Sequence, residues 1–416
     1  MGYINNNVIV SDNLWDQKIS LYIVFYFFAQ IANATIKTVF PIPDGLWNLI
    51  SVAWGGLIIF FMLRCLKGVW YRSRRILNTS LVLFTVIYLI SFGLILSRNE
   101  PTQGFWTGQV LISYAYWIPI GVAAASIRNK QVLYDMFYKW SYLMSLLLFA
   151  CVFFRRSTEL MEGETEYNMF FGFHLVIPAL FHISEYYKKK KKLILAFFIF
   201  EVLLLIIYAN RGALIPIVFY FVFRILLNDR TDSQTKTMKV LGLSVLTLLL
   251  FLLSEPLFNF LQDLSVSLGI RSRTLALMAS GDMTDPTGRD DLSEIAKRMI
   301  WESPVLGWGL GGEFYEISRQ LGQLVPGVSS AAFTPHNGIL EFLISFGVIG
   351  GLIASILFII PLFRLGQIRD PYTALLILIF GAAVVAPSLI TADGLLIKPG
   401  AAIYIYVYYY SRRSTK

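Results

Sequence analysis

Residues 188–213 read KKKKKLILAFFIFEVLLLIIYANRGA, and this stretch decides what kind of protein the chain is. Five lysines precede an apolar run from Leu193 to Ala209, whose only charged residue is Glu201. A helix needs about 20 mostly apolar residues to cross the hydrocarbon core of a membrane, and this run approaches that length. The stretch therefore predicts a membrane-spanning helix with a cationic end.

The composition of the whole chain has the same character. The 416 residues are 56% hydrophobic and only 15% charged, and their mean hydropathy is +0.63. Soluble domains carry roughly 25% charged residues, so much of this protein's surface faces lipid. Aromatic residues make up 15% of the chain, as expected where rings lie at the level of lipid headgroups. We therefore predict an all-α polytopic membrane protein.

The length rule predicts about 12 transmembrane helices. The segment 140–154 is short, and we expect its helix to begin earlier, near Tyr134. The predicted spans are 19–36, 46–66, 76–97, 105–127, 140–154, 169–187, 193–209, 212–228, 239–259, 337–363, 372–392 and 395–411.

The lysines and arginines predict how these spans are oriented. With the N-terminus inside, most of the 35 Lys and Arg residues fall in cytoplasmic segments, as the positive-inside rule requires. The net charge of +9 therefore indicates orientation and contact with anionic headgroups, and we predict no nucleic-acid partner. The expected location is the bacterial inner (cytoplasmic) membrane, with both termini cytoplasmic.

One predicted outer loop is much longer than the others. We accordingly divide the chain into residues 1–259 with transmembrane helices 1–9, a large extracytoplasmic helical loop at 260–335, and residues 336–416 with helices 10–12. Within the loop, apolar residues at helical spacing predict an amphipathic helix that lies on the membrane or packs on the bundle. These residues are Leu292, Ile295, Ala296, Met299 and Ile300.

Of the three histidines, His336 is the candidate for proton transfer. His174 and His182 lie inside a predicted span, where a satisfied intramembrane polar group is the ordinary explanation. His336 lies in the sequence TPHN, where the large loop enters the next span. If Thr334 caps that helix and Pro335 occupies its first position, the helix dipole keeps the imidazole neutral and able to accept a proton. The alternative is an interfacial histidine without a chemical role.

Two arginines on the predicted outer side are candidates for binding an anion. Arg211, in the sequence NRGA, occupies a tight turn at the edge of the hydrocarbon, where an arginine is costly unless it pairs or snorkels. Arg289 precedes the amphipathic stretch, and Thr287 with Asp290 has capping-box spacing, which puts Arg289 at a helix N-terminus that attracts anions. The alternatives are a snorkelling anchor for Arg211 and a solvated loop residue for Arg289.

Two other sequence patterns resemble ligand-binding motifs but are better explained by local structure. The sequence GWGLGG at 307–312 formally matches G-x-G-x-x-G, but no strand precedes it, so tight turns explain its glycines better than a dinucleotide does. Four carboxylates close in sequence are expected to solvate the loop and cap helices rather than hold a metal ion. These are Asp282, Asp285, Asp290 and Asp291. We predict no cofactor and no metal site.

Together these landmarks resemble the O-antigen polymerase and O-antigen ligase (Wzy-like) family of membrane glycosyltransferases. The resemblance rests on Arg211-Gly212, on Gly288-Arg289 followed by Trp301, Pro304, Gly307 and Gly309, and on Pro335-His336-Asn337 with Gly347. It implies a GT-C-like fold and metal-independent, inverting transfer from an undecaprenyl-diphosphate-linked oligosaccharide. Carried over to this sequence, Arg211 and Arg289 would bind the diphosphate, and His336 would take the proton of the acceptor hydroxyl.

Polymerases of this family pass the glycan to another lipid-linked repeat unit, whereas ligases pass it to lipid A core. The diversity of surface-polysaccharide polymerases favours polymerase here, which would make the lipid-linked oligosaccharide both donor and acceptor and give an O-antigen or capsular polysaccharide. Membrane lipids, a chain-length regulator and a flippase are the other expected partners. The rival from another class is a flippase or transporter, which places polar sites at the bilayer midplane.

Overall fold

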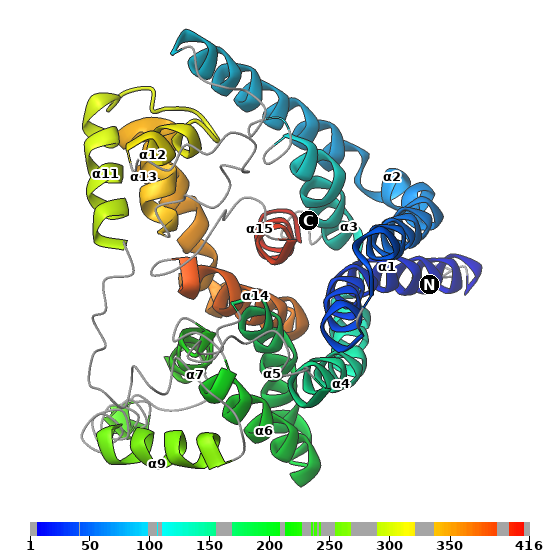
Figure 1. The fold of residues 1–416 in the computed structure, drawn as a ribbon. Coiled ribbons are helices and arrows are strands. Elements are labelled where there is room, and N and C mark those ends of the chain that lie inside the picture. The colour runs from blue at the N-terminus through cyan, green and yellow to red at the C-terminus, as the bar shows by residue number, and fades with distance from the viewer. Residues whose placement is uncertain are drawn as a thin grey trace. The chain divides into compact units, whose positions relative to one another are not determined.

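The structure is a computed structural model, and the part of the chain that it describes is helical (Figure 1). The described residues are 6–40, 42–98, 106, 110–154, 169–208, 213–226, 234–235, 237–238, 241–242, 254–267, 289–320, 337–388 and 399–411. No β-strand occurs among them, which confirms the all-α prediction.

The helices carry the following labels and bounds. They are α1 (Asn6–Val39), α2 (Asp44–Ser97), a π-helical turn (Ser113–Trp117), α3 (Ile118–Ser126), α4 (Lys130–Phe154), α5 (Met169–Lys189), α6 (Lys192–Tyr208), α7 (Ile215–Leu226), α9 (Ser254–Ser267), α11 (Arg289–Glu302), α12 (Glu313–Gln320), α13 (Gly338–Phe363), a 3-10 turn (Leu365–Gln367), α14 (Pro371–Ser388) and α15 (Pro399–Ser411). The start of α4 at Lys130 confirms that the span predicted at 140–154 begins earlier.

Several of these helices are suited to a membrane. Within the described residues, four meet the length and composition of a membrane-crossing helix when kinks are not considered, namely Asp12–Val39, Gly45–Ser97, Gly338–Phe363 and Pro371–Ser388. The chain is therefore a membrane protein. The count of 12 spans, the GT-C-like assignment and the three domain ranges remain predictions.

Helix α2 joins two predicted spans that we expected a loop to separate. The spans 46–66 and 76–97 both lie within it, and the only residue whose backbone leaves the helical region is Ser73, with φ −134° and ψ 22°. The connecting residues include Arg72, Arg74 and Arg75. No proline lies among them, so helix runs up to a kink at Ser73 from both sides, and the two spans meet at this kink where hydropathy alone suggested a loop.

The described chain forms two compact units, and the first is built on aromatic packing. It comprises residues 1–69, 127–285 and 368–379, where described. Helix α1 packs on α4, α4 on α5, and α5 on α6, with the Phe137 and Phe181 rings stacked 5.1 Å apart. The buried Asp16 carboxylate accepts hydrogen bonds from the backbone N–H groups of Arg128 (3.1 Å) and Asn129 (2.9 Å). Asp16 thereby fixes the chain entering α4 onto α1.

The second unit comprises residues 70–126, 286–367 and 380–416, where described. Helices α3 and α15 approach each other closely in it, because Gly121 leaves room for the Tyr406 ring. A Cβ atom at Gly121 would lie 2.5 Å from a carbon of that ring. The Tyr404 hydroxyl donates a 2.8 Å hydrogen bond to the carbonyl oxygen of Phe358, which ties α15 to α13.

Helix α13 reverses direction at Gly347 instead of running straight. Gly347 has φ 70° and ψ −179°. The Phe342 and Phe358 rings lie 5.8 Å apart, although a straight helix would separate these residues by about 24 Å. A Cβ atom at Gly351 would lie 2.5 Å from the Cα of Leu343. Residues 338–346 therefore fold back on residues 348–363, and we call this arrangement the α13 hairpin.

Replacing Gly347 by alanine is expected to destabilise the protein. A positive φ combined with a ψ near 180° is essentially restricted to glycine and costs another residue about 1–3 kcal/mol, and the new Cβ would lie 2.6 Å from the carbonyl oxygen of Val305. Gly347→Ala should therefore lower the melting temperature in detergent.

The matched control is Gly93→Ala in α2, because nothing lies within 4 Å of a Cβ there. Alanine is the better helix former at such a site, so Gly93→Ala should melt at or slightly above the wild-type temperature. Equal melting of the two variants would contradict the reversal at Gly347.

Candidate active site

The structure fixes where one of the three predicted site residues lies. Arg289 is the first residue of α11, which confirms its predicted position at a helix N-terminus. Its side chain, and all of Arg211 and His336, lie outside the described residues. The roles of these three residues therefore remain predictions.

The start of α13 corrects the predicted cap beside His336. The N-cap is Asn337, whose side-chain oxygen accepts hydrogen bonds from the backbone N–H groups of Ile339 (3.0 Å) and Leu340 (3.2 Å). The prediction that Thr334 caps this helix is wrong, because the Asn337 carboxamide satisfies these N–H groups instead. His336 consequently precedes the cap rather than lying in the first helical turn.

The predicted amphipathic face of α11 is confirmed. Its five apolar residues are each at most 7% exposed, and they form one cluster with Trp308, Ile317 and Ile344. Figure 1 shows α11, α12 and α13 next to one another. Of the two predicted placements, α11 thus packs on the bundle.

On α12, the Arg319 guanidinium donates to the Glu316 carboxylate and lowers the pKa of that carboxylate below its usual value.

The Gly-rich turn, residues 303–312, connects α11 to α12 and binds the α13 hairpin. Gly307, Gly309 and Gly311 all have positive φ, between 70° and 82°, which confirms the predicted tight turns. The helical reversal leaves backbone groups of α13 without partners in their own helix, and this turn supplies them. The three hydrogen bonds run from Trp308 N to Ile344 O (2.7 Å), from Gly309 N to Ser345 O (3.0 Å) and from Val348 N to Pro304 O (2.7 Å).

Arg98, which the sequence interpretation missed, holds this turn from the end of α2. Its guanidinium donates hydrogen bonds to Trp308 O (3.3 Å), Gly307 O (3.1 Å) and Ser303 Oγ (3.2 Å). It also lies 4.1 Å from the centroid of the Trp308 ring. Arg98 follows the predicted outer end of a span, and a cation on that side departs from the positive-inside rule, which was the available signal.

The two histidines inside predicted spans have polar partners, as expected. His174 Nε2 lies 3.2 Å from Gln30 Oε1. His182 Nδ1 lies 2.8 Å from Glu201 Oε1, which also accepts a hydrogen bond from Ser145, and both members of the His182–Glu201 pair are fully buried. The remaining atoms, His182 Nε2 and Glu201 Oε2, have no hydrogen-bond partner among the described residues.

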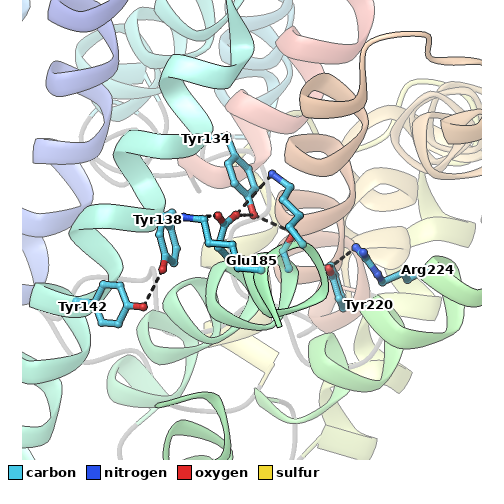
Figure 2. A network of polar contacts seen from close by, with 9 residues as sticks. Tyr134, Tyr138, Tyr142, Glu185, Tyr220 and Arg224 are labelled. Atoms are coloured by element: carbon cyan, nitrogen blue, oxygen red, sulfur yellow. Dashed lines mark hydrogen bonds and ion pairs between the residues drawn. The ribbon is translucent and has the colours of Figure 1, made fainter. Parts of the chain in front are cut away.

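A second polar network joins α4, α5 and α7 near the lysine run (Figure 2). The Tyr134 hydroxyl lies 2.9 Å from one oxygen of Glu185, and Lys189 Nζ lies 2.8 Å from the other. The Tyr138 and Tyr142 hydroxyls are 2.8 Å apart, while Arg224 donates to the Tyr220 hydroxyl (2.9 Å). The carboxylate of Glu185 is thus already occupied by donors, which favours a packing role over ligand binding.

No cluster of three or more His, Cys, Asp or Glu residues that is suited to a metal ion occurs in the described part of the chain. Of the four aspartates considered above, Asp282 and Asp285 lie outside that part. The side chains of Asp290 and Asp291 lie outside it as well.

The match to a known family covers the segment that carries all three predicted residues. Residues 193–355 match the O-antigen ligase family. The matched segment runs from α6 through α11 and the Gly-rich turn into the α13 hairpin. The family resemblance predicted from the sequence is confirmed over this segment. A search of curated proteins finds no match.

The matched family is one of enzymes that transfer glycans. Proteins of the O-antigen ligase family are glycosyltransferase-like enzymes of the ligase or polymerase type. The match therefore indicates a membrane protein of polysaccharide biosynthesis with that type of function.

Proposed function

We propose that this protein polymerises undecaprenyl-diphosphate-linked oligosaccharide repeat units on the outer face of the bacterial inner membrane. The observation that carries the proposal is the match of residues 193–355 to the O-antigen ligase family, because this segment contains Arg211, Arg289 and His336. The product is an O-antigen or capsular polysaccharide, and both termini lie in the cytoplasm. A chain-length regulator and a flippase are proposed partners.

In the proposed reaction, a hydroxyl of the acceptor glycan attacks the anomeric carbon of the donor. His336 accepts the hydroxyl proton, and the bond between the anomeric carbon and the diphosphate oxygen breaks. Undecaprenyl diphosphate leaves with the bonding electrons, and direct attack inverts the anomeric configuration. Arg211 and Arg289 neutralise the departing diphosphate, since planar guanidinium groups bind its oxygens in pairs.

Two other functions compete with polymerisation. An O-antigen ligase would use the same donor and transfer the glycan to lipid A core, and the matched family is described as O-antigen ligase. A flippase or transporter would use polar groups at the bilayer midplane. Against transport, the buried carboxylate of Glu201 pairs with His182, and that of Glu185 bonds Tyr134 and Lys189.

Purified protein supplied only with lipid-linked repeat units decides between these functions. A polymerase should form a ladder of longer glycans and release one undecaprenyl diphosphate for each bond formed, with the new linkage inverted. Transfer that begins only after lipid A core is added would make the protein a ligase. If the protein instead moves lipid-linked glycan from one leaflet of a vesicle membrane to the other and releases no undecaprenyl diphosphate, it is a flippase.

The orientation is tested by single cysteines in a background with Cys65 and Cys151 replaced by alanine. A cysteine at Asp285 should react with a membrane-impermeant maleimide in intact cells, because the large loop is predicted to lie outside. A cysteine at Lys190 should react only after the membrane is opened. The reverse labelling pattern would invert the topology and place the proposed active site in the cytoplasm.

A further inference from the structure

We infer that Arg98 is a positioning residue of the proposed active site, because it holds the Gly-rich turn against the α13 hairpin. The inference rests on the proposed function for its catalytic part. Its structural part rests on described residues of a single compact unit. In the described part of that unit Arg98 bonds residues of the Gly-rich turn, so its proposed role is to position this turn.

The guanidinium of Arg98 binds the Gly-rich turn at three points, and we call this arrangement the Arg98 clamp. Two of its three hydrogen bonds end on backbone carbonyl oxygens, those of Gly307 and Trp308, and the third ends on Ser303 Oγ. Ser303 Oγ in turn donates a 2.8 Å hydrogen bond to Gly307 O. The acceptors directly follow the C-terminus of α11, where the helix dipole also favours a cation. No described carboxylate pairs with Arg98, so its charge is directed at this turn.

The turn is held on a second side by the same helix. The backbone N–H of Leu310 donates to Ser91 Oγ at 3.0 Å. Gly309 lies so close to α2 that a Cβ there would be 2.8 Å from Ser91 Cα. The end of α2 therefore contacts the turn at both Ser91 and Arg98.

From the turn, the contacts continue to the two helices that matter for the proposed chemistry. The Trp308 indole N–H donates to Met299 O (2.8 Å) in α11, whose first residue is Arg289. The backbone N–H groups of Trp308 and Gly309 bond the first half of α13, whose N-cap directly follows His336. One guanidinium thus fixes the loop between a predicted diphosphate-binding residue and the predicted base.

The chemistry of the contact requires arginine. A lysine ammonium is a point charge, and it cannot reach the three acceptors in one plane while lying against the Trp308 ring. A displacement of catalytic groups by about 1 Å can cost up to about a hundredfold in rate. Arg98→Gln and Arg98→Lys should both lower kcat by roughly ten- to a hundredfold with little change in KM, as expected of a residue that positions catalytic groups rather than binding substrate.

The structural part is measured first by hydrogen exchange of the purified full-length protein. In Arg98→Gln, peptides covering residues 303–312 and 344–350 should exchange faster than in wild type. The matched control is Arg64→Gln, since Arg64 also lies on α2 beside an aromatic ring, that of Phe60. Unchanged exchange in Arg98→Gln would overturn the clamp.

The catalytic part is measured by a double-mutant comparison. If Arg98 acts through the site, Arg98→Gln should slow the wild-type enzyme but add little to the roughly hundred- to ten-thousandfold loss caused by His336→Ala, measured as the residual rate of undecaprenyl diphosphate release. A KM increase with unchanged kcat, or a full additional loss in the His336→Ala background, would overturn the positioning role. Wild-type protein inactive in both polymerase and ligase assays would refute the proposed function and the positioning role together, while the exchange experiment would still decide the clamp.

Discussion

His336→Ala is expected to abolish polymer formation while leaving expression and detergent stability intact. A general base contributes roughly a hundred- to ten-thousandfold in rate, and this variant removes the only proposed proton acceptor. The ladder assay measures the loss. Activity of the wild-type enzyme should also fall at acidic pH, because protonated imidazole cannot accept the hydroxyl proton.

The matched control for His336→Ala is His174→Ala. His174 lies within α5, and its ring nitrogen lies 3.2 Å from Gln30 Oε1, so polymer should still form in that variant. Near-normal polymer from His336→Ala would end the assignment of His336 as the base. Loss of polymer in both variants, together with lower melting temperatures, would point to misfolding instead.

Arg211→Lys and Arg289→Lys are expected to impair the enzyme severely although both keep the positive charge. Lysine lacks the planar fork that binds two diphosphate oxygens at once, so stabilisation of the leaving group should fall. By analogy with the removal of one donor from an oxyanion site, we expect each variant to lose roughly a hundred- to a thousandfold in kcat.

Arg369→Lys provides the control for the arginine variants, because Arg369 is exposed on the predicted cytoplasmic side. The same assay tests metal independence, since two guanidinium groups would take the place of a metal ion at the diphosphate. Polymer formation should survive EDTA. Strict dependence on a divalent cation would instead favour a metal-assisted mechanism that uses the aspartates at 282, 285, 290 and 291.

Helix content and one helix face were predictable from the sequence because they depend on local patterns. Hydropathy predicted helices such as α6 and α14 nearly at their observed bounds, and the spacing from Leu292 to Ile300 identified the buried face of α11. The glycines at 307–312 indicated tight turns because few other residues adopt positive φ. A helix start near Arg289 was also predicted, whereas the predicted capping residue Thr287 lies outside the described residues.

The contacts of the Gly-rich turn were not predictable in the same way. The reversal at Gly347 depends on partners about 40 residues earlier in the chain, such as Pro304 and Trp308, and hydropathy reports apolar content rather than chain direction. Arg98 lies even farther from its partners, because its three acceptors follow it by 205–210 residues in the sequence. Arg211 and His336 were selected by chemistry and resemblance, and the described residues leave their geometry as a prediction.

The α13 hairpin also has a consequence for the surrounding lipid. At 1.5 Å per residue, the half from Val348 to Phe363 is about 24 Å long, which is shorter than a hydrocarbon core of about 30 Å. A helix of this length creates hydrophobic mismatch, which a bilayer relieves by thinning next to the protein. The bilayer beside α13 is therefore expected to be thinner than the bulk membrane, which brings the headgroups of lipid-linked diphosphates closer to the bilayer centre along this helix.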